Sequence, residues 1–182
     1  MNFETIEYLK IGTPKQVKAY ELLAKYQLMA TLAKYEPLLV GTIPINIDIQ
    51  TSDLDIICYW QNKEEFKAFV ITHFGTCLGF KTWENYELNA VVANFMIEDF
   101  EIEIFGQNTP TKEQFAYKHL VIGNEILQAL GEDFRQNIIT LKKQGFKTEP
   151  AFAHLLKLEG NPYEALLTFR IDSLRKKNDR EV

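Results

Sequence analysis

The sequence is poor in cysteine, has no long apolar run and carries no basic surplus. Its two cysteines, Cys58 and Cys77, form neither a metal-ligand pattern nor a disulfide framework, so we expect a reducing, cytoplasmic setting. No apolar stretch is long enough to span a bilayer and no leader stands at the N-terminus, which predicts no membrane partner. The net charge of −5 argues against a nucleic-acid partner, because proteins that bind a phosphate backbone usually have a basic surplus.

The chain also lacks the short motifs of several enzyme classes. It has no Ser-His-Asp set, no Walker-type loop and no glycine-rich dinucleotide fingerprint. We interpret His73 and His154 as structural, because neither has a metal-ligand partner at a useful spacing. His119 is either a site residue or a packing histidine. We interpret Arg135 and the tail "RKKNDR" as solvated faces.

Apolar periodicity predicts an α+β fold, in which helices flank a mixed β-sheet and a helical part follows. The length of 182 residues suits a single domain. We expect the sheet core over about residues 14–107 and the helical C-terminal part over about 111–178. The expected helices are 14–36, 63–75, 124–144 and two that begin at 148 and 161. The expected strands are 38–40, 53–60, 88–99 and 100–106, and the pattern of 76–87 is ambiguous.

Two carboxylates open the second expected strand, in "SDLDIICYW". Side chains on a strand alternate, so Asp53 and Asp55 point to the same face, with Cα atoms roughly 6.5–7 Å apart. Two carboxylates this close repel each other unless a cation or a proton lies between them. Magnesium suits such a pair, because it binds a few carboxylate oxygens together with phosphate oxygens. The alternative is a strand end with two solvated aspartates.

A third carboxylate is available in "FEIEIFG", where apolar residues face one side and Glu101 and Glu103 face the other. Either glutamate could lie beside the aspartates, or both could be solvated on a half-exposed strand. Another feature is Gly41-Thr42, which follows a buried strand. Glycine permits a close approach of the backbone, and successive N–H groups there can bind phosphate oxygens, unless the pair is simply a turn. Lys142, Lys143 and Lys147 could bind a triphosphate or stabilise the end of a helix through its dipole.

In order along the chain, "VGT", "SDLDII" and "FEIEIFG" resemble the motif of the polymerase-beta-like nucleotidyltransferase superfamily. Longer stretches resemble a bacterial domain family of unknown function within that superfamily. These stretches are "GTIPINIDIQTSDLDIICY", "EIFGQ", "AYKHL", "LKKQGFKTEPAFAHLL" and "LEGNPYEALL". The resemblance implies a nucleotidyltransferase-like fold and brings no established substrate.

The resemblance also implies an activity and a set of site residues. The activity is metal-dependent transfer of a nucleotidyl group from a nucleoside triphosphate to a hydroxyl of an unknown small molecule or protein. Asp53, Asp55 and Glu103 would be the catalytic acids and would bind Mg²⁺, with Mn²⁺ as the alternative ion. Gly41, Thr42, Ser52 and Lys142 would bind the nucleotide phosphates.

The sequence departs from the superfamily motif at two points. The third acid is a glutamate where aspartate is common, and the apolar segment "IPINIDIQT" replaces the usual polar helix after the glycine pair. This apolar segment and the small number of basic residues near the motif leave a second hypothesis open, a catalytically inactive nucleotide-binding or interaction module of the same fold. The nucleotide, the acceptor and the oligomeric state stay open as well.

Overall fold

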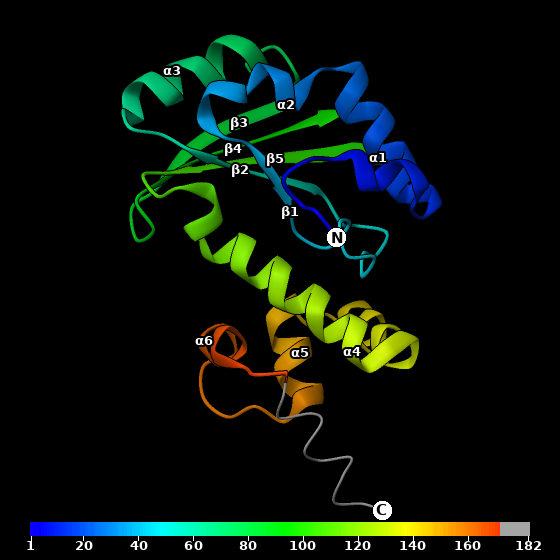
Figure 1. Ribbon diagram of the computed structural model, residues 1–182. Coiled ribbons are helices and arrows are strands. Elements are labelled where there is room, and N and C mark those ends of the chain that lie inside the picture. Colours follow the sequence, from blue (N-terminus) through cyan, green and yellow to red (C-terminus); the bar gives the residue numbers. More distant parts are fainter. Residues whose placement is uncertain (172–182) are drawn as a thin grey trace, which may run out of the picture.

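The computed structural model describes residues 1–171, and Figure 1 shows a sheet with helices on both faces. The five strands form one mixed sheet in the order β1-β2-β5-β4-β3. Strands β2 and β5 are parallel, and the other neighbours are antiparallel. The predicted mixed sheet flanked by helices is therefore confirmed. The strands are β1 (Leu38–Val40), β2 (Leu54–Tyr59), β3 (Leu78–Asn85), β4 (Ala90–Ile97) and β5 (Phe100–Gln107).

One face of the sheet packs on the helices of the N-terminal half and α3. Alternate residues of β2, such as Leu54, Ile56 and Cys58, are completely buried here among leucines and aromatic rings. Burial of this apolar surface is the main contribution to stability, at about 25 cal/mol per Å². The helices on this face are η1 (Glu7–Ile11), α1 (Pro14–Lys25), α2 (Leu28–Thr31), η2 (Ala33–Tyr35) and α3 (Lys63–Phe74).

The opposite face is partly covered by the C-terminal helices, which lie below the sheet in Figure 1. Leu120, Ile126 and Leu127 of the longest helix pack with Ile57 of β2 in a second apolar cluster. That helix is interrupted at Gly131, whose φ of 77° is not helical. The elements of this part are η3 (Thr111–Glu113), α4 (Phe115–Lys143), α5 (Thr148–Leu156) and α6 (Pro162–Thr168).

The prediction of one helix over 14–36 is wrong beyond its first three turns. The start is as expected, because the Thr13 side chain accepts a hydrogen bond from the Gln16 backbone N–H and Pro14 occupies the first turn. Helix α1 ends before Gln27, which has a left-handed φ of 52°. The resulting bend lets Leu23 and Leu28 enter the same apolar cluster. Tertiary packing thus overrides the helical periodicity of the segment.

The structure settles or revises two further sequence expectations, and a third lies partly outside the described residues. The ambiguous segment 76–87 contains β3, an edge strand whose exposed side chains give it no clear alternation. The helix expected from 124 begins earlier, at Phe115. The helical part was expected to reach about residue 178, but residues 172–178 and the whole tail "RKKNDR" lie outside the described residues. Within the described part of the chain, no helix is both long and apolar enough to cross a membrane.

Candidate functional site

The pairing of β2 with β5 brings the acidic residues of the two strands together. Asp55 is the direct partner of Glu103 in the parallel register. Neighbouring strands lie about 4.8 Å apart, and side chains of directly paired residues point to the same face. Asp53 precedes β2 by one residue and shares the face of Asp55. Three carboxylates predicted from separate parts of the sequence therefore lie on one patch of the sheet.

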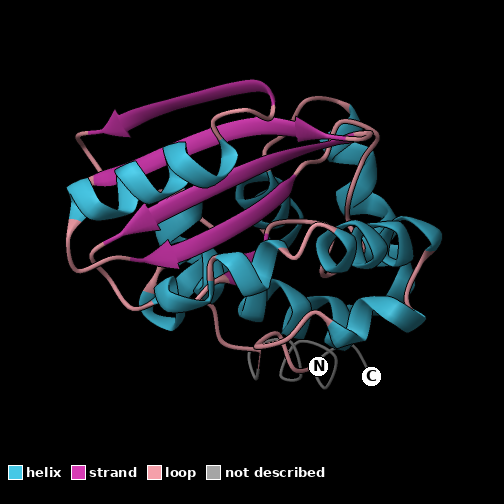
Figure 2. Ribbon diagram, turned by 90° about the horizontal axis from the view of Figure 1, so that it is seen from above, coloured by secondary structure: helices cyan, strands magenta, loops and turns pink. Residues whose placement is uncertain are grey.

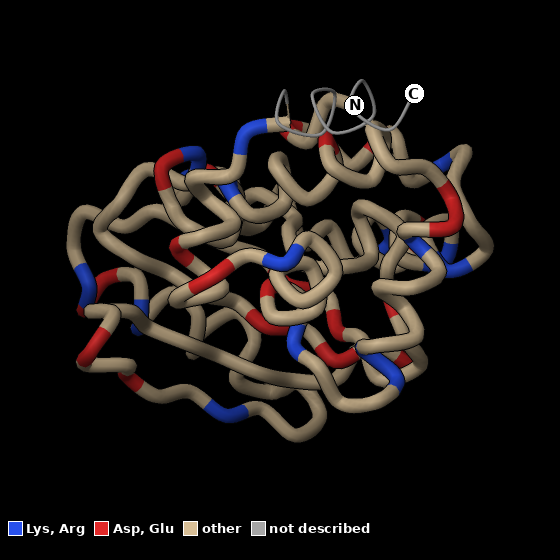
Figure 3. The backbone as a smooth tube through the Cα atoms, turned by 90° about the horizontal axis from the view of Figure 1, so that it is seen from below, with Lys and Arg blue, Asp and Glu red and all other residues tan. Residues whose placement is uncertain are grey.

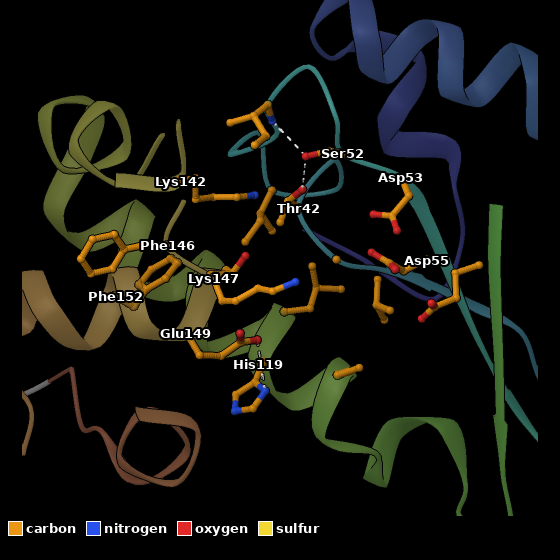
Figure 4. Close-up of a pocket in the computed structure, with 18 of the residues that line it drawn as sticks. Thr42, Ser52, Asp53, Asp55, His119, Lys142, Phe146, Lys147, Glu149 and Phe152 are labelled. Carbon is orange, nitrogen blue, oxygen red and sulfur yellow. Dashed lines mark hydrogen bonds and ion pairs between the residues drawn. The ribbon is translucent and has the colours of Figure 1, made fainter. Parts of the chain in front are cut away.

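These carboxylates line a cavity of about 630 Å³ between the sheet and the C-terminal helices. Figure 4 shows Asp53 and Asp55 on the sheet side, and Lys142 and Lys147 extending toward the cavity from the opposite side. The same cavity is lined by Gly41, Thr42, Ser52, Glu103, His119, Phe146, Glu149 and Phe152. The residues to which the resemblance assigned metal or phosphate binding thus all border one space, whereas Lys143, a further candidate for the triphosphate, does not.

Among the acids of the cavity, Asp55 has the most strongly shifted pKa. Burial, reinforced by the neighbouring charges of Asp53 and Glu103, raises its pKa to about 8. Lys142 opposes this shift, but no cation within residues 1–171 forms an ion pair with the Asp55 carboxylate. A buried carboxylate with like charges beside it is unfavourable until a proton or a cation neutralises it.

The structure distinguishes between the two glutamates of β5. Glu103 lines the cavity, and burial followed by repulsion from Asp53 and Glu101 raises its pKa. Glu101 is exposed, does not line the cavity and accepts a 3.1 Å hydrogen bond from the Asn94 side-chain amide. Glu103 is therefore placed to act with the aspartates, while Glu101 lies at the margin.

Glycine is required at position 41 both by the backbone conformation there and by the neighbouring Asp55 side chain. Its φ of 79° is in the region that favours glycine, and an added Cβ would collide with the Asp55 carboxylate. The hydroxyls of Thr42 and Ser52 bond to each other at 3.1 Å, and Ser52 also accepts from the Ile49 backbone N–H at 2.9 Å. These hydroxyls border the cavity and at the same time fix the loop between β1 and β2.

Basic side chains from two helices hold the loop of residues 43–52. Lys15 donates to the Ile49 carbonyl at 2.7 Å, and Arg135 donates to the carbonyls of Ile45 and Asn46. The interpretation of Arg135 as solvated is wrong, because its side chain is largely buried against this loop. The isoleucines of "IPINIDIQT" turn inward, so their carbonyls need donors from elsewhere in the chain.

Lys142 is the third cation of this loop and also lines the cavity. Its ammonium donates to the Ile47 carbonyl at 2.9 Å, and the side chain is buried. Burial lowers its pKa to about 8, against the opposing influence of Asp48 and Asp55. An ammonium has three donors, so Lys142 keeps capacity for a ligand oxygen while it holds the loop. Lys143, which the sequence placed beside it, is exposed.

The helical side of the cavity contributes His119 and Glu149, of which the sequence analysis considered only His119 as a possible site residue. The His119 Nε2 donates to the Tyr163 carbonyl at 2.9 Å, because a carbonyl oxygen can only accept. The other ring nitrogen, Nδ1, lies 3.5 Å from Glu149 Oε1. The sequence marked Glu149 only as part of a helix start, and no local pattern connects it with His119. Their contact depends on how α5 packs on α4.

The donor chemistry of the site suits a hard divalent cation. Asp53, Asp55 and Glu103 offer carboxylate oxygens, and among residues 1–171 no lysine or arginine forms an ion pair with the half-buried Asp55. Among residues 1–171, however, no group of three His, Cys, Asp or Glu side chains is arranged to hold a metal ion. Magnesium is commonly bound by one or two carboxylates together with substrate phosphates, so a nucleotide would supply the remaining ligands.

The fold is that of polymerase-beta-like nucleotidyltransferases. A Cid1 poly(U) polymerase structure with MgGTP bound has a TM-score of 0.58 and 11% identity, covering 79% of this chain and 49% of that one. The structure of the GLD-2/RNP-8 complex has a TM-score of 0.57 and 11% identity, and the match covers 87% of this chain and 68% of that one. The polymerase core of TRAMP has a TM-score of 0.52 and 10% identity, and the match covers 88% of this chain and 50% of that one. The chain thus spans about half the length of the Cid1 chain.

Within this fold, the chain belongs to the family described as Domain of unknown function (DUF4269), whose model matches residues 21–169. None of the curated proteins is similar to it in sequence. The matched range includes the cavity-lining residues of β2, β5, α4 and α5.

Proposed function

We propose that the protein is a metal-dependent nucleotidyltransferase, which uses a nucleoside triphosphate and a hydroxyl acceptor. The observation that carries the proposal is the pairing of Asp55 with Glu103 on parallel strands, beside Asp53 and the Gly41 bend. A cluster of half-buried, mutually repelling carboxylates is unfavourable by itself, and such clusters are typical of sites that bind charged ligands. Nucleotides with Mg²⁺ or Mn²⁺ supply the missing positive charge together with phosphate oxygens.

In the proposed reaction, an acceptor oxygen forms a bond to the α-phosphorus and the bond between that phosphorus and the bridging β-phosphate oxygen breaks. Pyrophosphate leaves, and the proton of the hydroxyl passes to the Glu103 carboxylate. Burial and the neighbouring carboxylates raise the pKa of Glu103, which makes it a stronger proton acceptor when ionised. A bound divalent ion would neutralise phosphate charge, and Asp53 and Asp55 are the residues that would hold it.

Lysines on the helical side suit the leaving group. Lys142 and Lys147 line the cavity opposite the acids, where pyrophosphate charge would develop. Phe146 and Phe152 line the cavity beside these lysines and offer apolar surface. In-line attack places the acceptor on the far side of the α-phosphorus from these lysines, which is the side of Glu103.

A second candidate is a nucleotide-binding module without catalysis. It is favoured by the contacts of Lys142, Thr42 and Ser52, which already bond to the loop or to each other. It is also favoured by the absence, within residues 1–171, of a three-ligand arrangement for a metal.

Two measurements separate these candidates and test both. Thermal unfolding with ATP, GTP, CTP or UTP, each with and without Mg²⁺, should show a higher melting temperature for at least one metal–nucleotide pair. Release of pyrophosphate from that nucleotide then identifies an enzyme, whereas binding without turnover identifies a module. If no nucleotide raises the melting temperature with either Mg²⁺ or Mn²⁺, both candidates fail.

A further inference from the structure

The face of the sheet that carries Asp55 and Glu103 continues across β4 to the edge strand β3. In Figure 2 the outermost long strand, β3, lies at one side of the molecule, while most helices gather at the other. The register gives the order of side chains across this face: Asp55, Glu103, Asn94, then Lys81. One step along the strands, the next row runs Ile57, Phe105, Val92, then Trp83.

Trp83 is the distinctive residue of this open face. It is 43% exposed although it is a large aromatic residue, and its strand neighbour Val92 is buried beside it. Strand spacings place its Cα about 12 Å from that of Glu103, two strands across and two residues along. With side chains extending from both ends, this distance leaves room for one or two rings of a small molecule.

The charges around β3 and β4 do not favour a nucleic-acid strand as the occupant. Asp53, Glu101 and Glu103 present carboxylates, and Lys81 is the one basic residue in the two rows described above. Figure 3 views the molecule from below, and the coloured residues show blue and red segments interspersed without a continuous basic band. A nucleic-acid strand needs such a band to neutralise its phosphates.

We infer that β3 and β4 bind the acceptor of the reaction, and that this acceptor is a sugar or amino-sugar ring without phosphate. The inference rests on the proposed function and names its acceptor class. A sugar ring presents apolar C–H faces that can stack on Trp83, and its hydroxyls can bond to Asn94 and Lys81. Its reacting hydroxyl then meets Glu103, the oxygen joins the α-phosphorus, the proton passes to Glu103 and pyrophosphate leaves.

The protein has a built-in probe for this binding. It contains two tryptophans, of which Trp60 is buried and Trp83 is exposed, so acrylamide quenching of fluorescence reports mainly on Trp83. We expect glucosamine or N-acetylglucosamine at millimolar concentration to reduce this quenching about twofold, and an oligo(A) or oligo(U) RNA to leave it unchanged. Trp83→Phe should abolish the sugar-dependent change, which assigns the signal.

A kinetic comparison then tests whether the surface serves the acceptor. Trp83→Ala should raise the KM for the sugar roughly tenfold, with little change in kcat or in the metal–nucleotide thermal shift. Tyr86→Ala is the matched control, because Tyr86 is an exposed aromatic residue in the turn that follows β3. It should leave the sugar KM unchanged.

The outcomes distinguish this inference from the proposed function. Protection of Trp83 by RNA, or nucleotidyl transfer to RNA rather than to a sugar, overturns the acceptor class. Nucleotide binding without any protection by sugars overturns it as well. Protection by a sugar in a protein that binds no nucleotide supports the surface and refutes the transferase.

Discussion

The two faces of the same sheet differ sharply, although single strands contribute to both. On the face toward α1 and α3, Leu54, Ile56 and Cys58 are fully buried in apolar packing. On the other face, Asp53 and Asp55 from the same stretch border a cavity. Because side chains alternate along a strand, consecutive residues in and just before β2 have different roles: those on one face stabilise the fold, and those on the other line the cavity. Substitutions on the packed face should therefore mainly lower stability, whereas those on the cavity face should mainly reduce ligand binding or activity.

The largest expected effect is on the cavity face, at Glu103. Glu103→Gln removes the proposed proton acceptor and should reduce nucleotidyl transfer by about 10²–10³-fold, with little loss of stability. Glu101→Gln is the matched control, since Glu101 is two residues away on the same strand face and outside the cavity. Pyrophosphate release measures both variants. Equal losses in the two variants would show that Glu103 has no distinct role.

Substitutions of two glycines, one on the packed face and one beside the cavity, allow a direct comparison of the two faces. Gly106 faces the packed side, where an added Cβ would collide with the Phe66 ring, whereas at Gly41 it would collide with Asp55. We expect Gly106→Ala to lower the free energy of unfolding by about 3 kcal/mol through overpacking. Gly41→Ala should abolish metal–nucleotide binding in protein that still unfolds cooperatively, although its positive φ adds about 1 kcal/mol of strain. Urea unfolding and a nucleotide thermal shift together check the contrast, which fails if Gly41→Ala binds normally.

The charged face should also make stability depend on pH. The pKa of Asp55 is raised to about 8, so the folded protein holds a proton that the unfolded chain releases above its ordinary pKa of 3.8. Stability contributed by this proton is present at low pH and is lost as pH rises toward 8. Asp55→Asn should therefore stabilise the metal-free protein more at pH 8.5 than at pH 5, by on the order of 2–4 kcal/mol.

Urea unfolding of wild type and variant at the two pH values measures this difference. Leu54→Val, one residue away on the packed face, is the control and should destabilise the protein equally at both pH values. A pH-independent effect of Asp55→Asn would contradict the assignment of a buried, proton-binding carboxylate.

The smallest expected effect concerns the loop that borders the cavity. Lys142→Met keeps the apolar stem but leaves the Ile47 carbonyl without its donor, which should cost about 1–2 kcal/mol of stability. Lys143→Met, at an exposed neighbouring position, should change stability by less than about 0.5 kcal/mol. Equal unfolding midpoints for the two variants would mean that the Lys142 bond does not hold the loop.

The parts of this picture that depend on local patterns were predictable from the sequence. Alternation in "SDLDIICYW" and "FEIEIFG" placed the acids on one face of each strand and the apolar residues on the other. Local alternation could not choose between Glu101 and Glu103, and only the resemblance favoured Glu103, because the choice depends on the register of two strands that are distant in sequence. The same limit applies to "IPINIDIQT", whose carbonyls are bound by Lys15, Arg135 and Lys142 from distant helices.

Isothermal titration of the metal–nucleotide pair that gives the largest thermal shift tests the central claim most directly. The measurement compares wild type with the Asp53→Asn/Asp55→Asn double variant. If the two aspartates hold a divalent ion against the nucleotide phosphates, the double variant should bind at least a hundredfold more weakly and lose its response to Mg²⁺. Equal affinities in the two proteins, each with the same dependence on Mg²⁺, would contradict the account.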